Sequence, residues 1–203
     1  MRKMIYGFLP CFFAAPAWSA LIMSGEVNLS ITTNLDGIYL DLVSGSVVPV
    51  DDDLSDSQVN LFFGGDGIFT SERFLPARVG TGNSDSVLNL ALGLPISNDL
   101  SFASAGFGSS MTHIGNNVGQ FEIGTEGYIG FKFDRLDDDN YTFGWMRVTL
   151  TNGSSPGIVH EWAYSDTPGE LVEVGGPVII PEPMTGIMTL LASLGAVFLR
   201  RRM

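Results

Sequence analysis

Cysteine, histidine and basic residues are scarce in this chain of 203 residues. The single cysteine, Cys11, lies in an apolar stretch near the N-terminus, so the rest of the chain has no thiol for a disulfide or for nucleophilic catalysis. The two histidines, His113 and His160, have no metal-ligand partner two or four residues away. These absences argue against a disulfide scaffold, a histidine-based metal site and a catalytic cysteine. They predict a protein that is not an enzyme.

Acidic residues dominate the charge, with 22 Asp and Glu against ten Lys and Arg. Half of the basic residues lie at the two ends, as Arg2, Lys3 and the run 200–202, which leaves five basic and 21 acidic residues between them once Glu182 is set aside. The intervening segment therefore carries a net charge near −16. Phosphate binding needs clustered Lys and Arg, so this balance argues against a nucleic acid partner. It predicts soluble chains that repel one another.

Residues 1–20 have the order of a secretory signal peptide. A basic pair precedes an apolar run that is too short to span a membrane, and small residues follow it. Cleavage after Ala17 or Ser19 keeps small residues at the two key positions of the cleavage site. Cleavage after Ala20 instead puts the bulky Trp18 at the third position back. We therefore expect export, with signal peptidase as a processing partner.

Residues 179–203 carry a second terminal signal. Three features follow one another: the triplet Pro181, Glu182 and Pro183, the uncharged run 184–199, and the cluster Arg200, Arg201 and Arg202. A helix over the uncharged run would be about 24 Å long, slightly less than the roughly 30 Å hydrocarbon core, and local thinning with long arginine stems covers the difference. The terminal positive charge predicts that this end is cytoplasmic and that the body of the protein lies outside.

In this order and at this position, the three features resemble the PEP-CTERM sorting signal of Gram-negative bacteria. The resemblance covers about a ninth of the chain. It implies recognition by exosortase, a membrane protease-transferase that cleaves near the motif and passes the protein to the cell surface or extracellular matrix. The residues alone also allow an ordinary C-terminal membrane anchor that is never cleaved.

The body, residues 21–178, is predicted to be one all-β domain. Apolar and polar residues alternate with a period of two, the later segments are rich in aromatic and β-branched residues, and turn-forming residues separate the segments. No part of the body has a sustained helical period. We expect an antiparallel β-sandwich of jelly-roll type, between an N-terminal signal helix and a C-terminal transmembrane helix. The predicted strands cover 27–31, 38–42, 59–63, 88–92, 128–133, 141–150 and 158–164.

The last two predicted strands are expected to pair as a hairpin. Their Phe-Gly-Trp and Trp-Ala-Tyr runs resemble a strand pair of secreted PEP-CTERM proteins, which implies a sandwich and no chemistry. Strict alternation would set Tyr141 and Trp145 beside Trp162 and Tyr164, with His160 on the face of Trp162 as a hydrogen-bonded structural residue. If exposed, these aromatics could stack on sugar rings. The interpretation that we favour is that they fill the space between two sheets.

Two acidic clusters offer oxygen ligands of the kind that Ca²⁺ prefers. The first contains Asp51 and Asp53, and the second contains Asp137 and Asp139. Neither has the spacing of an EF-hand loop or of a glycine-rich calcium repeat. We expect solvated loops that keep the protein soluble, with a Ca²⁺ site as the alternative and no other cofactor.

These observations leave two functional hypotheses. The favoured one is a non-enzymatic, exported surface or matrix protein with a structural or adhesive role, associated with exopolysaccharide or biofilm and tethered by its C-terminal helix before processing. The alternative is a carbohydrate-binding or glycan-processing β-sandwich that uses the aromatic face or the acidic loops.

Overall fold

The computed structural model of the protein describes residues 20–48, 54–55, 57–82, 84–105, 113–136 and 138–176. The predicted signal helix and the predicted transmembrane helix lie outside these residues.

Strands make up nearly all of the regular structure in the described part. The elements are β1 (Leu21–Met23), β2 (Leu29–Ile31), β3 (Ile38–Asp41), β4 (Ser46–Val48), β5 (Gln58–Phe62), the 3₁₀ helix η1 (Phe63–Gly65), β6 (Gly67–Thr70), β7 (Phe74–Arg78), β8 (Pro95–Ile96), β9 (Ser101–Phe102), β10 (Glu126–Asp134), β11 (Tyr141–Thr149), β12 (Gly157–Ser165) and β13 (Val172–Glu173).

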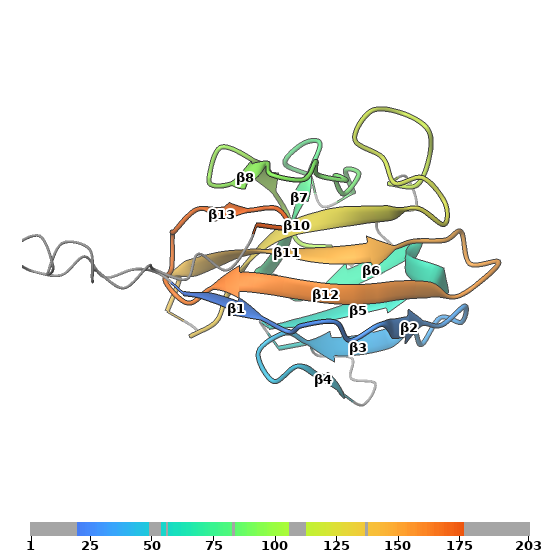
Figure 1. The fold of residues 1–203 in the computed structure, drawn as a ribbon, viewed down its shortest axis with the longest axis horizontal. Coiled ribbons are helices and arrows are strands. Elements are labelled where there is room, and N and C mark those ends of the chain that lie inside the picture. Colours follow the sequence, from blue (N-terminus) through green and yellow to red (C-terminus); the bar gives the residue numbers. More distant parts are fainter. Residues whose placement is uncertain are drawn as a thin grey trace, which may run out of the picture. The chain divides into compact units, whose positions relative to one another are not determined.

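The strands form two antiparallel sheets and one separate pair. The larger sheet has the order β1-β12-β11-β10-β7-β9, and β2 pairs with the end of β12 that β1 leaves uncovered. The second sheet has the order β4-β3-β5-β6, and β8 pairs with β13. Figure 1 shows the three long strands β10, β11 and β12 side by side. The prediction of an all-β chain with antiparallel strands is thus confirmed for the described residues.

An apolar core joins the two sheets. Phe131, Val148 and Trp162 enter it from the larger sheet, Leu40 and Leu61 enter it from the second sheet, and all five are at most 1% exposed. Full burial of such a side chain stabilises a fold by about 1.5–3 kcal/mol. We call the face of the larger sheet that lines this core the inner face, and the opposite one the outer face.

A smaller core cluster, which we call the outer cluster, covers part of the outer face. Phe143 and Trp145 of β11 pack there with Ala163 of β12, and β8 and β13 contribute Ile96 and Val172. The middle of β11 is therefore buried on both faces. A strand covered on both sides needs apolar residues in succession, which explains why 143–146 reads Phe-Gly-Trp-Met without alternation.

The predicted segments differ in how well they match the strands. The pairing of β11 with β12 across the turn at 152–156 confirms the predicted hairpin. Residues 88–92 are not a strand, although an isolated bridge joins Asn89 to Ile129 and the Leu90 N–H donates to the Tyr128 carbonyl at 2.9 Å. Leu90 packs in the outer cluster, so side-chain burial explains the apolar pattern of this segment without a continuous ladder.

Candidate functional site

Several residues that the sequence singles out lie outside the described residues. These are Pro181, Glu182, Pro183, Arg200, Arg201 and Arg202 of the predicted sorting signal, and Asp51, Asp53 and Asp137 of the acidic clusters. The described residues contain no helix that is both long enough and apolar enough to cross a membrane.

The two tryptophans of the hairpin lie on opposite faces of the larger sheet. Trp145 is opposite Ala163 in the ladder, whereas Trp162 is opposite Met146. Trp162 belongs to the core between the sheets and donates its indole N–H to the Leu42 carbonyl at 3.1 Å, while Trp145 belongs to the outer cluster. The expected aromatic face shared by both strands therefore does not form. Each tryptophan is only 1% exposed, so neither offers a surface for stacking on a sugar.

A β-bulge in β12 separates His160 from Trp162. Arg147 is opposite Glu161, but the next residue of β11, Val148, is opposite Val159, so His160 is an extra residue in the ladder. Side chains beyond the bulge point to the face opposite to that given by strict alternation. Val159 consequently joins Trp162 in the inner core. The expectation that His160 shares the face of Trp162 is wrong for this reason, whereas its expected hydrogen bonding is confirmed.

Tyr164 is a core residue. It is 2% exposed and packs edge-on against Phe133, with 5.2 Å between the ring centroids. Burial raises the pKa of its hydroxyl above the ordinary value. It is therefore placed for packing between the sheets and not for contact with a ligand.

Tyr141 differs from the other three aromatic candidates because it lines a surface hollow of about 210 Å³. We call this the Tyr141 hollow. Its lining combines rings with amide and carboxylate groups: Asn98, Asp139, Asn140, Tyr141, Phe143 and Pro168, with the backbone of Gly169. The ammonium group of Lys132 lies 5.0 Å from the centroid of the Tyr141 ring and 5.0 Å from that of Phe102. Cation–π contacts of this kind restrain the tyrosine ring.

Asp139 enters the Tyr141 hollow from the turn between β10 and β11. Its side chain is 84% exposed and lies 3.2 Å from the Arg73 guanidinium, and its backbone has the positive φ of 61°. The buried carboxylate of Asp134 stabilises this turn. It accepts hydrogen bonds from the backbone N–H groups of Asp138 at 3.2 Å and Asp139 at 2.9 Å, and it forms an ion pair with Arg73. One aromatic and one acidic candidate are thus brought together here, although they were predicted for different ligands.

The hydrogen bonds of Asp134 decide its ionisation. Burial alone would raise the pKa of this carboxyl, but the backbone N–H groups of Asp139 and Asp138 and the Arg73 guanidinium hold the pKa below its ordinary value. The carboxylate is consequently ionised and engaged in its own turn. Among the described residues no group of three or more His, Cys, Asp or Glu could hold a metal ion. A Ca²⁺ site at these clusters stays a hypothesis.

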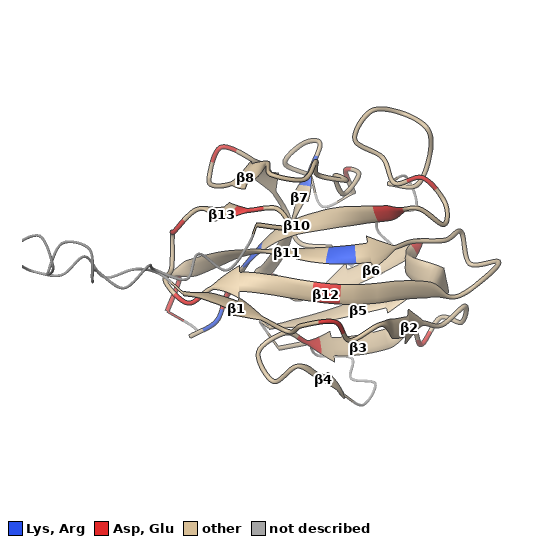
Figure 2. Ribbon diagram, viewed as in Figure 1, with Lys and Arg blue, Asp and Glu red and all other residues tan. Residues whose placement is uncertain are grey.

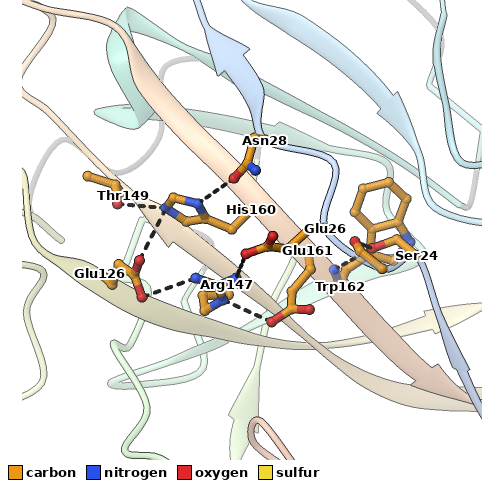
Figure 3. A network of polar contacts seen from close by, with 10 residues as sticks. Ser24, Glu26, Asn28, Glu126, Arg147, Thr149, His160, Glu161 and Trp162 are labelled. Carbon is orange, nitrogen blue, oxygen red and sulfur yellow. Dashed lines mark hydrogen bonds and ion pairs between the residues drawn. The ribbon is translucent and has the colours of Figure 1, made fainter.

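A polar network that the sequence did not predict occupies the outer face beside the outer cluster. Arg147 of β11 contacts three carboxylates: Nε to Glu161 at 2.9 Å, Nη1 to Glu126 at 3.1 Å and Nη2 to Glu26 at 3.4 Å. Figure 2 shows acidic positions on β10 and β12 on either side of a basic position on β11, and Figure 3 shows the guanidinium between the carboxylates. Burial would lower the pKa of Arg147, but the hydrogen bonds to Glu161 and Glu126 raise it above the ordinary value.

The same network holds His160 between a hydroxyl and an amide. Nε2 lies 2.8 Å from Thr149 Oγ1, and Nδ1 lies 2.9 Å from Asn28 Oδ1 (Figure 3). Because an amide oxygen only accepts, Nδ1 donates, and in the neutral ring Nε2 accepts from the hydroxyl. Hydroxyl, imidazole and orienting group also follow one another in this order in hydrolytic triads. Thr149, however, lies on a strand paired on both sides, so the ladders engage the nearby backbone N–H groups that would have to stabilise an oxyanion.

We therefore interpret this network as a clamp across the three strands β10, β11 and β12 and the segment before β2. Sequence signals for it were weak, because Glu26, Asn28 and Glu126 are far from Arg147 along the chain. The alternation of β11 does place Arg147 and Thr149 on one face, and a charged residue on a long, aromatic strand is the one clue that the sequence contains.

Comparison of the chain with family models, with curated proteins and with solved structures gives no match.

Proposed function

We propose that this protein is an exported component of the surface or extracellular matrix of a Gram-negative bacterium, with a structural or adhesive role associated with exopolysaccharide or biofilm. The observation that carries the proposal is the order of the proline-flanked triplet 181–183, the apolar run 184–199 and the arginine cluster 200–202 at the C-terminus. The resemblance of this order to a PEP-CTERM signal makes exosortase the processing partner. Signal peptidase acts at the other end.

The properties of the body support this role. An exported domain must remain folded and soluble without the help of chaperones inside the cell, and this one combines a net charge near −16 with two apolar core clusters and no cysteine. In architecture, we propose a β-sandwich in which the two antiparallel sheets enclose their shared core. The jelly-roll connectivity stays a prediction.

Cell fractionation tests the sorting proposal. The full chain is expected in the envelope and then at the surface or in the matrix, whereas a chain that lacks 179–203 is expected to lose this distribution. A third chain with Glu182→Ala and Pro183→Ala keeps the apolar run and the arginines, so it separates exosortase processing from simple anchoring. This motif variant should stay in the membrane with residues 184–203 still attached. Identical distribution of all three chains would contradict the proposal. Surface release of the motif variant would show that the motif is not required, and would favour an ordinary C-terminal anchor from which a protease other than exosortase releases the protein.

A second candidate function is favoured by the Tyr141 hollow. Sugar sites combine a ring for stacking with a few amide and carboxylate groups that bind hydroxyls, and the hollow brings Tyr141 together with Asn98, Asp139 and Asn140. Its volume of about 210 Å³ is below the roughly 300–1,000 Å³ of sites for drug-sized ligands, which favours a single sugar ring. The carboxylate and the acidic body favour a neutral saccharide over an anionic one.

A glycan array probed with the exported protein tests this second function. Tyr141→Ala should abolish binding to a neutral glycan, and Tyr141→Phe, which keeps the ring, should retain most of it. Trp145→Ala is unsuitable as a probe because the side chain is buried. Thermal melts of each variant report whether it is folded. An array on which the folded wild-type protein binds no neutral glycan would eliminate the saccharide site and leave the sorting proposal intact.

A further inference from the structure

The segment at the predicted signal-peptide boundary is already part of the folded domain. Ala20, directly before β1, forms two hydrogen bonds with Asp166, directly after β12. The Ala20 N–H donates to Asp166 Oδ1 at 3.0 Å, and the Asp166 N–H donates to the Ala20 carbonyl at 2.9 Å. The ladder continues from there, with Leu21 opposite Ser165. Figure 1 shows β1 alongside β12. Ala20 itself is exposed, so a chain end at this position meets no steric obstacle.

These contacts distinguish the cleavage positions that the sequence leaves open. Cleavage after Ala20 would remove both bonds to Asp166, and the bulky Trp18 already disfavours it. Cleavage after Ala17 keeps both bonds but places the new amino group two residues away from the carboxylate. Cleavage after Ser19 keeps both bonds and makes the nitrogen that contacts Asp166 Oδ1 the new chain end.

We propose that the mature protein begins at Ala20 and that its α-ammonium group forms an ion pair with Asp166. Hydrolysis of the Ser19–Ala20 peptide bond by signal peptidase uses one water molecule, leaves a carboxylate on Ser19 and frees the amino group of Ala20. This inference rests on the export part of the proposed function. It adds the identity of the new chain end and the partner that receives it.

The pairing changes the chemistry of one existing contact. In the uncleaved chain the donor is a neutral amide, whereas after cleavage it is a cation that is largely protonated near neutral pH. The carboxylate already makes the uncleaved contact a charge-assisted hydrogen bond, and cleavage adds the Coulombic attraction between two opposite charges. Processing thereby strengthens the attachment of β1, an edge strand of three residues, to β12. The Thr167 hydroxyl also donates to Asp166 Oδ1 at 3.0 Å, which orients the carboxylate before and after cleavage.

The first measurement is the N-terminal peptide of the exported protein, identified by mass spectrometry in wild-type cells that make the full chain. A peptide that begins at Ala20 is expected. One that begins at Trp18 or Leu21 would overturn this inference and leave export intact. A chain that still begins at Met1 would overturn export itself, so the two failures are distinguishable.

The second measurement is the reactivity of the α-amino group toward an acylating reagent, followed on the N-terminal peptide of the folded protein. Only the uncharged amine reacts, and a paired carboxylate favours the charged form, so Asp166→Asn should raise the rate by about 3- to 10-fold. Asp99→Asn is the matched control, since the Asp99 carboxylate contacts Ser97 instead, and it should leave the rate at the wild-type value. Equal rates in wild-type and Asp166→Asn protein would overturn the ion pair.

Discussion

Gly144 of β11 lies directly opposite Phe131 of β10, and the phenyl ring occupies the space that a side chain at Gly144 would need. A Cβ atom at this position would come within 2.5 Å of the Phe131 ring and within 2.5 Å of the Ala163 carbonyl oxygen. The glycine between two aromatic residues of β11 is thus required by the packing of β10 and β12 on either side.

Replacement of this glycine should therefore destabilise the domain. Gly144→Ala is expected to lower the free energy of unfolding by about 1–3 kcal/mol, because backbone and ring must both move to admit one methyl group. Urea denaturation followed by tryptophan fluorescence measures the change. Ser46→Ala on the exposed strand β4 is the control and should stay within about 0.5 kcal/mol of wild type. A Gly144→Ala protein as stable as that control would contradict the packing argument.

Arg147 places one positive charge among three carboxylates, and its removal should leave them to repel one another without it. Arg147→Met is expected to lower the free energy of unfolding by about 1–3 kcal/mol, between the values for exposed and buried ion pairs, since the Arg147 side chain is 14% exposed. This loss in the free energy of unfolding should be smaller in high salt, which screens the repulsion between the carboxylates. Glu26→Gln, at the most exposed carboxylate of the three, should change stability by less than about 1 kcal/mol. A deficit that is independent of salt would show that lost packing, and not charge, is responsible.

Asp134 should make stability depend on pH in the acid range. Its pKa in the folded protein lies below the ordinary value of 3.8, so the ionised form stabilises the fold fully above about pH 3.8, and this contribution is lost as the pH falls through the lower, folded-state value. Asp134→Asn should lower the melting temperature near neutral pH, and the difference from wild type should narrow toward about pH 2. Thermal melts across this range measure it. A constant difference at every pH would mean that the charge of Asp134 has no role.

Arg78 is a buried cation held by backbone carbonyl groups. It is 1% exposed and donates to the carbonyl groups of Ala103 at 2.9 Å, of Ser104 at 3.0 Å and of Asp85, which ties these three residues to β7. Arg78→Lys should lower the free energy of unfolding by about 2–4 kcal/mol, because an ammonium group does not reproduce the planar set of donors. Arg73→Lys, at a half-exposed site that keeps its ion pair, should lower it by less than about 1 kcal/mol. Similar losses in both variants would argue against a special role of the guanidinium shape.

The sequence predicted strands best where the strands are long. Long runs of aromatic and β-branched residues predicted the β11–β12 hairpin, because the composition of a nine-residue strand is distinctive even where its alternation is interrupted. The two-residue strands β8, β9 and β13 are too short to show any period, and their positions follow from packing on the outer face. Residues 88–92 have the alternation of a strand because Leu88 and Leu90 meet the outer cluster, although a continuous ladder is absent there.

The candidate site could be predicted only in part. One inserted residue, His160, explains much of the difference between the predicted and the observed faces of β12. The bulge at His160 shifts every side chain on one side of it to the other face, and nothing in the local residue types marks that insertion. Trp145 is buried by the layer over the outer face, and Trp162 is buried by the second sheet, and both of these come from distant segments of the chain. The Tyr141 hollow combines residues from three separate stretches of the chain, so no local motif contains it.

The burial of β11 on both faces has a consequence for how the domain opens. Solvent reaches the amides of this strand only if the neighbouring strands and the layers above and below separate together, so these amides should be the last to exchange with deuterium. The edge strands β1, β4 and β9 can fray one at a time without that event. Mechanical or chemical stress on the protein would accordingly be absorbed first at its periphery, while the centre of the larger sheet sets the lifetime of the folded state.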